Sequence, residues 1–329
     1  MLRKLWFGLL ISVPPAMAQI APGSLDVKWS EGAEQCESAP PEAPLQVHRY
    51  DDQTFILRED LCATFEAPFI YLLLGSSKAL LIDTGAVSDP KIMPLADTVT
   101  DLLPAAGSSK MPLLVLHTHR HLDHRAGDSQ FANRPGVQVV PAMLEDVRKY
   151  FGFEDWPEAS AQVELGDRTI DVIPTPGHNS THLAFYDRNT GLFLSGDFML
   201  PGRLLVEDSD AYLASALRVA DFIETRPITH VLGAHIEMDR EGELFPWGST
   251  HHPHERSLPL TKEDLLSLPG LLRSFNGFHT RRGQWVMMNP NRQLIAMGAG
   301  AALLLLALIW LARRYFRRRK AARAAAREG

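Results

Sequence analysis

A short stretch near the middle of the chain concentrates side chains that bind metal ions. Residues 118–124 read Thr-His-Arg-His-Leu-Asp-His, and imidazole and carboxylate groups are the usual protein ligands of zinc and related ions. His119 and His121 lie two residues apart, so an extended segment presents both on one side, where they can share one metal. Asp123 and His124 are adjacent and are expected to diverge, which suits a second metal or a supporting role.

Three further residues of ligand type follow predicted strands elsewhere in the chain. His178 ends a Pro-Thr-Pro-Gly-His turn, Asp197 ends Ser-Gly-Asp, and His235 follows Gly-Ala. A carboxylate such as Asp197 has two oxygens and can bridge two cations. Any one of these histidines alone would more often be an ordinary surface or core residue. Their coincidence at the ends of several strands instead favours a metal site where the strand ends meet.

The elements that must position these residues can be read from the apolar pattern. Short apolar runs between turn-forming residues predict strands, and helical spacing of apolar residues predicts helices. The predicted strands are 54–57, 69–74, 79–82, 113–116, 137–140, 169–173, 183–186, 192–194 and 230–232. The predicted helices are 90–103, 142–151, 209–225 and 261–275, the last with Thr261 as its N-cap. We therefore expect one mixed α/β (α+β) domain over residues 48–290, after a loose lead-in over residues 19–47.

Both ends of the chain differ from this globular middle. Residues 1–18 carry Arg3 and Lys4 before a short apolar run and a small-x-small site, which predicts a secretory signal peptide. Residues 294–312 are predicted as a transmembrane helix, because the uncharged run 294–311 spans about 27 Å of helix, close to the ~30 Å core of a bilayer, and the tail 313–329 is strongly basic. This pattern predicts a single-pass protein of the cell membrane, with its domain on the periplasmic or extracellular side and its tail in the cytoplasm. A buried helix is the alternative for each segment.

The net charge of the domain argues against some classes of binding partner. The formal net charge is −6, and the two ends hold a surplus of Lys and Arg, so the domain between them is more acidic than the total indicates. Such a domain is a poor candidate for binding nucleic acid. The basic tail could contact anionic lipid, although control of topology explains it equally well.

The chain holds two cysteines, Cys36 and Cys62. In an exported domain an even pair suggests one disulfide, which would pin the N-terminal segment to the first strands. Two free buried thiols are the alternative. Neither cysteine lies near a histidine motif, so we assign neither to metal.

The motifs resemble those of the metallo-β-lactamase superfamily of hydrolases. The resemblance rests on Thr-His-x-His-x-Asp-His, Pro-Gly-His, Gly-Asp and Gly-x-His, and it covers about residues 50–236. It implies a four-layer αβ/βα sandwich with the site at the edge between two sheets. It implies a first metal held by His119, His121 and His178. It also implies a second metal held by Asp123, His124 and His235, with Asp197 bridging the two.

The resemblance also assigns supporting roles. Asp83, in Asp-Thr-Gly, matches an Asp that supports the metal loop, and His182 is either a supporting residue or a core histidine. Asp197 is the bridging residue typical of glyoxalase II-like and lactonase-like members, whereas zinc β-lactamases usually carry Cys or Ser there. A loop over residues 236–260 could cover the mouth of the site and set substrate choice. That loop contains His251, His252 and His254.

A site with two metals of this type predicts hydrolysis. Two zinc ions, or iron or manganese in their place, lower the pKa of a shared water, which attacks a small ester, lactone, thioester or amide as hydroxide. Asp123 is predicted to orient this nucleophile while it ligates. The alternatives are an iron-dependent sulfur or oxygen redox enzyme on the same fold, β-lactam hydrolysis, and a non-enzymatic membrane-tethered metal-binding domain. The predicted partners are a small-molecule substrate and the lipid bilayer, and the sequence indicates no particular protein partner.

Overall fold

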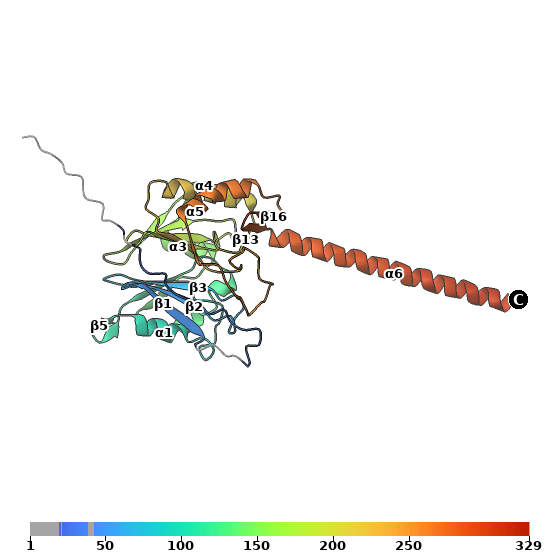
Figure 1. Cartoon of the computed structure of the whole chain (residues 1–329), viewed down its shortest axis with the longest axis horizontal. Coiled ribbons are helices and arrows are strands. Elements are labelled where there is room, and N and C mark those ends of the chain that lie inside the picture. The colour runs from blue at the N-terminus through green and yellow to red at the C-terminus, as the bar shows by residue number, and fades with distance from the viewer. Residues whose placement is uncertain (1–19, 21, 39–42, 329) are drawn as a thin grey trace, which may run out of the picture.

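The computed structural model describes residues 20, 22–38 and 43–328, which Figure 1 shows as a cartoon. Two six-stranded sheets lie face to face, helices cover their outer faces, and one long helix projects from the domain. The predicted signal peptide, residues 1–18, lies outside the described residues.

The first sheet combines an antiparallel meander with a parallel edge. Its strand order is β1-β2-β3-β4-β7-β8, and β4, β7 and β8 run parallel. The bounds are β1 Leu45–Asp51, β2 Thr54–Glu59, β3 Phe69–Leu74, β4 Ala79–Ile82, β7 Leu113–Leu116 and β8 Val137–Val139. In β3, Phe69, Tyr71 and Leu73 enter the core between the sheets. The residues between them enter the core under helix α1 (Leu95–Leu102), because successive side chains of a strand point to opposite faces.

The second sheet has the order β15-β14-β12-β11-β10-β9. The bounds are β9 Ala161–Glu164, β10 Thr169–Pro174, β11 Leu183–Asp187, β12 Leu192–Gly196, β14 His230–Gly233 and β15 Pro259–Leu260. β12 and β14 pair in parallel, and β11 is antiparallel to both β10 and β12. As a result β10, β12 and β14 run in the same direction and end at the same edge.

Helices complete the outer layers. Figure 1 shows α4 and α5 on the outer face of the second sheet and α1 outside the first. The bounds are α2 Asp128–Phe131, α3 Leu144–Phe151, α4 Ser209–Ile223 and α5 Lys262–Arg273. α5 begins at a capping box in which Thr261 and Asp264 satisfy each other's backbone N–H. The helix predicted over residues 90–103 begins only at Leu95, directly after Pro94. The four-layer αβ/βα sandwich is confirmed.

The structure also contains a small third sheet that the sequence does not predict. It has the order β13-β17-β16, with β13 and β17 parallel. The bounds are β13 Arg203–Leu205, β16 His279–Arg282 and β17 Trp285–Met288. β17 leads directly into the long helix α6, Pro290–Glu328. A short hairpin of β5 (Ala105–Ala106) and β6 (Ser109–Lys110) and a 3-10 turn, η1 (Leu122–His124), complete the described elements.

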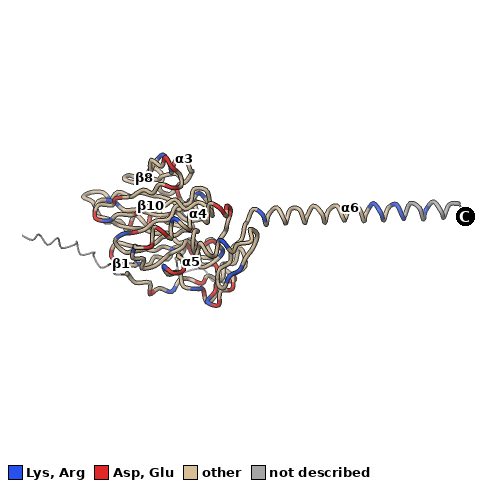
Figure 2. Tube along the Cα trace, turned by 90° about the horizontal axis from the view of Figure 1, so that it is seen from above, with Lys and Arg blue, Asp and Glu red and all other residues tan. Residues whose placement is uncertain are grey.

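Helix α6 is long and apolar enough to cross a membrane, judged by length and composition. Its candidate span is Pro290–Arg318, with a mean hydropathy of 2.5, and none of the apolar stretch is buried within the described structure. Figure 2 shows Lys and Arg gathered on the distal part of the helix. The span expected over residues 294–312 falls inside it, and the orientation of the chain in a membrane stays a prediction.

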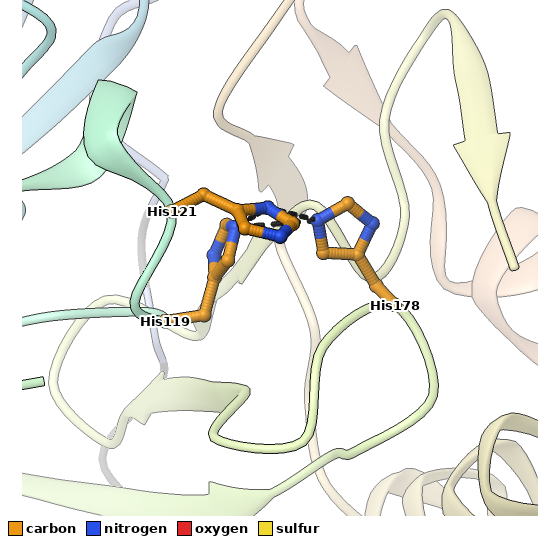
Figure 3. A group of neighbouring side chains, drawn as sticks. All are labelled: His119, His121 and His178. Carbon is orange, nitrogen blue, oxygen red and sulfur yellow. Dashed lines mark hydrogen bonds between the residues drawn. The ribbon is translucent and has the colours of Figure 1, made fainter. Parts of the chain in front are cut away.

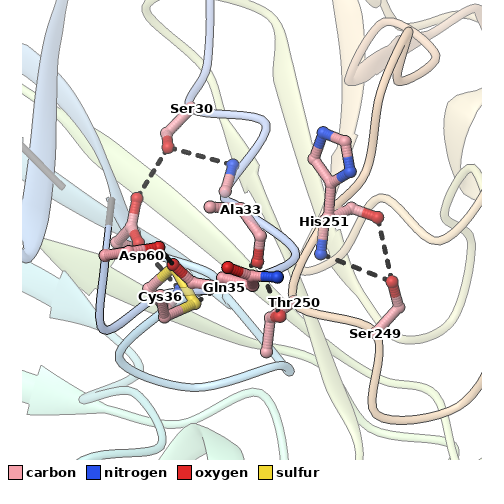
Figure 4. The surroundings of a disulfide bond; sticks show 11 residues. Ser30, Ala33, Gln35, Cys36, Asp60, Ser249, Thr250 and His251 are labelled. Carbon is pink, nitrogen blue, oxygen red and sulfur yellow. Dashed lines mark hydrogen bonds between the residues drawn. A yellow bond between two sulfur atoms is a disulfide. The ribbon is translucent and has the colours of Figure 1, made fainter. Parts of the chain in front are cut away.

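The segment before β1 is tied to the domain more closely than its composition predicts. A disulfide joins Cys36 and Cys62, with an S–S distance of 2.05 Å (Figure 4). Beside it, the Thr250 hydroxyl donates to the Ala33 carbonyl at 2.8 Å, and the Ala33 N–H donates to the Thr250 carbonyl at 2.9 Å. The N-terminal segment therefore lies against the loop over residues 236–260.

A buried arginine joins the two halves of the sandwich. Arg168 is 2% exposed, and its guanidinium donates to both oxygens of Asp187, at 3.1 and 2.6 Å. It also donates to the carbonyls of Gln53 (2.8 Å) and Leu74 (3.1 Å) and to the hydroxyl of Thr54 (2.7 Å), which belong to the first half. Because these groups are removed from water, loss of Arg168 would leave the Asp187 carboxylate buried without its cation.

We expect Arg168→Met to destabilise the fold by about 3–5 kcal/mol, because it leaves the Asp187 carboxylate buried without its cation. The thermal midpoint should fall by roughly 10 °C, followed by near-ultraviolet circular dichroism on the full chain in detergent. Arg49→Met is the matched control: Arg49 pairs with Asp52 at 2.7 Å, but the two side chains are 62% and 92% exposed, so a loss of about 1 kcal/mol or less is expected. Equal shifts for the two variants would contradict this account.

Candidate metal centre

The seven predicted ligands gather at one edge of the sandwich. The loop after β7 carries His119, His121 and the turn η1, and β7 runs parallel to β4 beside it. His178, Asp197 and His235 follow the ends of β10, β12 and β14, which point the same way. Side chains that follow such strands meet at the edge where the strands end.

Three histidines form the first donor group (Figure 3). His119 Nε2 lies 2.8 Å from His121 Nδ1, and His178 Nε2 lies 3.2 Å and 3.1 Å from those two atoms. Nitrogens bound tetrahedrally to zinc at about 2.0–2.1 Å are roughly 3.3 Å apart. The three donor atoms therefore have nearly the spacing that one tetrahedral ion requires.

Asp123, His124, Asp197 and His235 form the second donor group. His124 Nε2 lies 3.3 Å from Asp123 Oδ2 and 3.5 Å from Asp197 Oδ2. His235 Nε2 lies 3.4 Å from Asp123 Oδ2 and 3.6 Å from Asp197 Oδ1. Asp197 Oδ2 is also 3.4 Å from His178 Nε2, so this carboxylate lies between the two groups. Contrary to expectation, Asp123 and His124 do not diverge, because the tight turn η1 directs both toward the same point.

The donor chemistry fits divalent metal ions. Asp197 is 7% exposed, and its Oδ1 has no hydrogen-bond partner among the described residues. A buried carboxylate oxygen without a partner is costly, and a cation beside it removes that cost. In each group the donor atoms lie within 4.8 Å of one another. Each group could therefore hold a metal ion, and imidazole with carboxylate suits zinc, iron and manganese alike.

Charge differs between the two groups. Burial is the main cause that holds the pKa of His119 well below its usual value, and the neighbouring imidazoles lower it further. Burial also acts to lower the pKa of His124, but Asp123 and Asp197 outweigh it and hold that pKa well above the usual value. Conversely, burial acts to raise the pKa of Asp123, but His124 and His235 hold it far below its usual range. The second group therefore combines ionised carboxylates with a protonated His124 ring, whereas the His119 ring of the first group is neutral.

Asp83 supports the loop after β7, which carries the donor residues His119, His121 and Asp123. Its Oδ1 accepts from the Thr118 N–H at 2.7 Å, and its Oδ2 accepts from the Thr118 hydroxyl at 2.9 Å and lies 2.9 Å from His124 Nδ1. A proton on Nδ1 that is donated to Asp83 leaves Nε2 of His124 free to ligate. Asp83 has a φ of 70°, a left-handed conformation that is uncommon outside glycine. These hydrogen bonds hold the strained turn at the end of β4 in place.

Backbone carbonyls orient two further rings. His235 Nδ1 lies 2.8 Å from the Glu66 carbonyl oxygen, and His178 Nδ1 lies 3.2 Å from the Leu205 carbonyl oxygen. In both rings the Nε2 atom is thereby turned toward the other donors. The sequence does not indicate these partners, because a carbonyl has no side-chain signature and Leu205 belongs to the unpredicted strand β13.

Two polar residues support the site without joining a donor group. His182 is buried, with Nδ1 2.8 Å from Thr175 Oγ1, and its Nε2 accepts from the Asp197 N–H at 3.2 Å. It therefore steadies the backbone of Asp197. Glu207 Oε1 lies 3.5 Å from His121 Nε2, and nothing in the sequence pattern indicates this contact.

The histidines of the loop over residues 236–260 lie beside the site. His252 Nδ1 is 3.0 Å from Glu255 Oε1, and His252 lines a small cavity together with His235. None of His251, His252 and His254 belongs to either donor group among the described residues. The loop therefore borders the second group without supplying a ligand to it.

A further carboxyl is buried beneath the second group. Glu59 ends β2, and its Oε2 accepts from the Ala86 N–H at 3.0 Å, while its Oε1 has no partner within the described chain. A Cβ on Gly85 would lie 2.1 Å from that oxygen, and Gly85 has a φ of 74°, so only glycine fits there. Burial raises the pKa of Glu59 to about 8, so this carboxyl is mostly protonated at neutral pH.

The sequence matches the family model of the Metallo-beta-lactamase superfamily over residues 63–235. That stretch is more than half of the chain and contains all seven donor residues. Together with the fold and the position of the donors, the match shows that the chain belongs to the metallo-β-lactamase superfamily.

Several known proteins are similar to this chain. Human acyl-coenzyme A thioesterase MBLAC2 is 23% identical over 237 residues, which are 61% of this chain and 84% of that protein. The hydroxyacylglutathione hydrolase of Nostoc punctiforme is 28% identical over 141 residues, 41% of this chain and 51% of that protein. A solved metallo-beta-lactamase from Pontibacter korlensis is 18% identical with a TM-score of 0.46, covering 70% of this chain and 100% of its own. The prediction of a hydrolase of this superfamily is confirmed at the level of the class.

We expect Asp83→Asn to weaken zinc binding at the second donor group by about 10- to 100-fold, because His124 loses its carboxylate partner. Binding at the first group should stay within about 3-fold, since Asp83 reaches that group only indirectly, through the Thr118 hydroxyl beside His119 Nδ1. A competition titration against a chromophoric chelator separates the two affinities. Asp128→Asn is the control, because Asp128 pairs with His117, outside both groups. An equal loss at both groups, or none, would refute the role given to Asp83.

We expect Glu59→Gln to change how stability depends on pH. The folded-state pKa of Glu59, about 8, lies above its ordinary value of 4.5, so between these values only the folded state holds the proton. Wild-type stability should therefore fall as pH rises from about 5 to 8, and the variant should lack this component. Urea unfolding at several pH values measures it, with the exposed Glu158→Gln as control. Parallel profiles for wild type and Glu59→Gln would show that the carboxyl does not titrate as described.

Proposed function

We propose that this protein is a binuclear metal-dependent hydrolase that cleaves acyl esters or thioesters at the outer surface of a membrane. The main support for this proposal is the pair of adjacent donor groups, with the buried carboxylate of Asp197 between them. The thioesterase relative supports the choice of a carbonyl substrate with an oxygen or sulfur leaving group. The apolar helix α6 supports the placement at a membrane.

In this proposal each donor group holds one ion. His119, His121 and His178 would hold the first, and Asp123, His124 and His235 would hold the second, with Asp197 shared by both. When bound, two such ions lower the pKa of a water molecule and polarise the substrate carbonyl. Zinc is the ion that a tetrahedral nitrogen set favours, and iron and manganese share its ligand types.

The chain's own residues would orient the reactants. Asp123 remains a carboxylate because the His124 and His235 imidazoles hold its pKa far below its usual range, so it can accept a hydrogen bond from the attacking water. Its side chain is 23% exposed, which makes it the most accessible carboxylate of the second group. Asp123 would therefore orient the water while it ligates. The carbonyls behind His178 and His235 keep those rings from turning away.

The placement of the protein follows from its two ends. The predicted signal peptide would export the domain, α6 would span the bilayer once, and the basic tail would stay in the cytoplasm. The acidic domain would then face the periplasm or the extracellular space, where a disulfide between Cys36 and Cys62 persists.

Removal of metal should abolish hydrolysis, and His119→Ala should lower kcat/KM by more than about 100-fold. The test uses the full chain in detergent with a panel of ester, thioester, lactone, amide, phosphodiester and β-lactam substrates, beside metal analysis by mass spectrometry. His279→Ala is the matched control, since His279 is exposed on β16 outside the donor groups.

Three outcomes would overturn the proposal. Hydrolysis that survives both chelation and His119→Ala would exclude a metal-dependent reaction. Stoichiometric iron with no hydrolysis of any substrate would instead favour the iron-dependent redox enzyme. Turnover of the β-lactam alone would favour a β-lactamase.

A further inference from the structure

One residue connects the donor groups to the beginning of the apolar helix. Glu207 Oε1 lies 3.5 Å from His121 Nε2, and the Glu207 carbonyl accepts from the Asn289 side-chain amide at 3.3 Å. Asn289 immediately precedes α6. His121 is therefore linked through the single residue Glu207 to Asn289, the residue directly before the candidate membrane helix.

The small third sheet makes the same connection through the backbone. β13 and β17 pair in parallel, with Leu205 opposite Met288, and the Leu205 carbonyl is the partner of His178 Nδ1. The Val206 N–H donates to the Met288 carbonyl at 2.8 Å. Figure 1 shows β13 and β16 at the root of α6. The sheet that orients a donor histidine is thus the sheet from which α6 departs.

The first turn of α6 is held against the domain. Arg292 Nη1 donates to the Gly277 carbonyl at 3.0 Å, and the Gln293 side-chain amide donates to the Phe278 carbonyl at 3.4 Å. The apolar stretch begins at Leu294, five residues after Asn289 and about 7 Å further along the helix. The polar layer outside the apolar core of a bilayer is only about 5–8 Å thick on each side. The third sheet would therefore lie at the level of the lipid headgroups.

Exposed apolar side chains surround the donor groups. Leu122, between two donor residues, is 64% exposed, Trp247 is 59% exposed and Phe65 is 43% exposed. Trp247 and Phe65 line the same cavity as His235, and Trp247 lies over the Arg203 guanidinium of β13 at 4.4 Å. Large apolar groups exposed around a site mark a contact surface, and tryptophan in particular favours the interface between lipid and water. We call Phe65, Leu122 and Trp247 the apolar rim.

We propose that the mouth of the metal centre rests on the bilayer surface through this apolar rim, and that the substrate is a long-chain acyl ester or thioester whose chain stays in the membrane. The inference rests on the hydrolase function proposed above and adds the source of the substrate. A bilayer is favoured over a second protein because Trp247 of the rim contacts Arg203 of β13, in the sheet that α6 would hold at the headgroup layer.

The reaction needs no reactant other than water. Oxygen of the water forms a bond to the acyl carbonyl carbon, and the bond from that carbon to the ester oxygen or thioester sulfur breaks. One water proton passes to the departing oxygen or sulfur, and the fatty acid keeps its chain in the leaflet. A polar leaving group would depart into the aqueous space.

The first test lifts the domain away from the membrane. The full chain is reconstituted in phosphatidylcholine vesicles, and kcat/KM is measured for a membrane-embedded palmitoyl thioester and for a soluble acetyl thioester of the same thiol. A semi-rigid helical spacer of about 30 Å inserted between Asn289 and Pro290 should lower the ratio of palmitoyl to acetyl kcat/KM by at least 10-fold. The same spacer inserted after Gly107, in the exposed turn between β5 and β6, should leave the ratio unchanged.

The outcomes separate this inference from the function on which it rests. An unchanged ratio with the spacer before α6 would overturn the membrane-facing mouth while leaving the hydrolase intact. If the wild type cleaves neither thioester, the proposed thioesterase function is wrong. The position of the mouth is then tested by a second measurement that does not depend on activity.

That measurement is quenching of tryptophan fluorescence by brominated phospholipids in the same vesicles. Trp310 lies within α6, so the comparison is made in a Trp310→Phe background. Quenching that falls at least 2-fold when Trp247→Phe is added places the apolar rim in the interface. Quenching that is unaffected by Trp247→Phe places Trp247 in water and overturns the inference.

Discussion

The burial of carboxylates at the edge between the two sheets is the constraint on which the structure depends. Asp83 and Asp197 are almost inaccessible to water, and both lie within hydrogen-bond or ion-pair distance of His124. Carboxylates so placed stay ionised only where N–H donors and positive charge surround them. Imidazole rings supply part of that compensation and a bound cation supplies the rest. The edge is therefore stable only when every loop that carries a donor is in its place.

These donors come from both halves of the sandwich. Asp123 and His124 follow the first sheet, whereas Asp197 and His235 follow the second. An ion held by all four would join the sheets at this end, so part of its binding free energy would appear as folding free energy. The opposite end is joined by the buried pair of Arg168 and Asp187. The packed core between the two sheets is thus held at both ends by charged groups.

The parts of the fold that follow from local pattern are readable from the sequence. Buried strands such as Phe69–Leu74 are nearly continuous apolar runs, and a ligand set placed after strand ends needs only residue type and spacing. Two strands of the third sheet lack such a pattern: β16 reads His-Thr-Arg-Arg and β13 has only three residues, and their partners are set by tertiary contacts. The same holds for Glu59, Glu207 and the carbonyl of Leu205. Their roles depend on tertiary contacts between distant segments, and no local sequence motif indicates those contacts.

The unpredicted sheet also explains why anchoring and catalysis would be linked in this molecule. β17 carries the chain into α6 while its neighbour β13 positions the ring of His178 through Leu205. A tilt of α6 that displaced β17 would also displace β13, because the two parallel strands share one ladder of hydrogen bonds. A helix attached through a flexible linker would impose no such relation. The direction of α6 and the geometry of the first donor group are therefore structurally coupled, and in the proposed membrane placement this coupling would fix the position of the mouth relative to the bilayer.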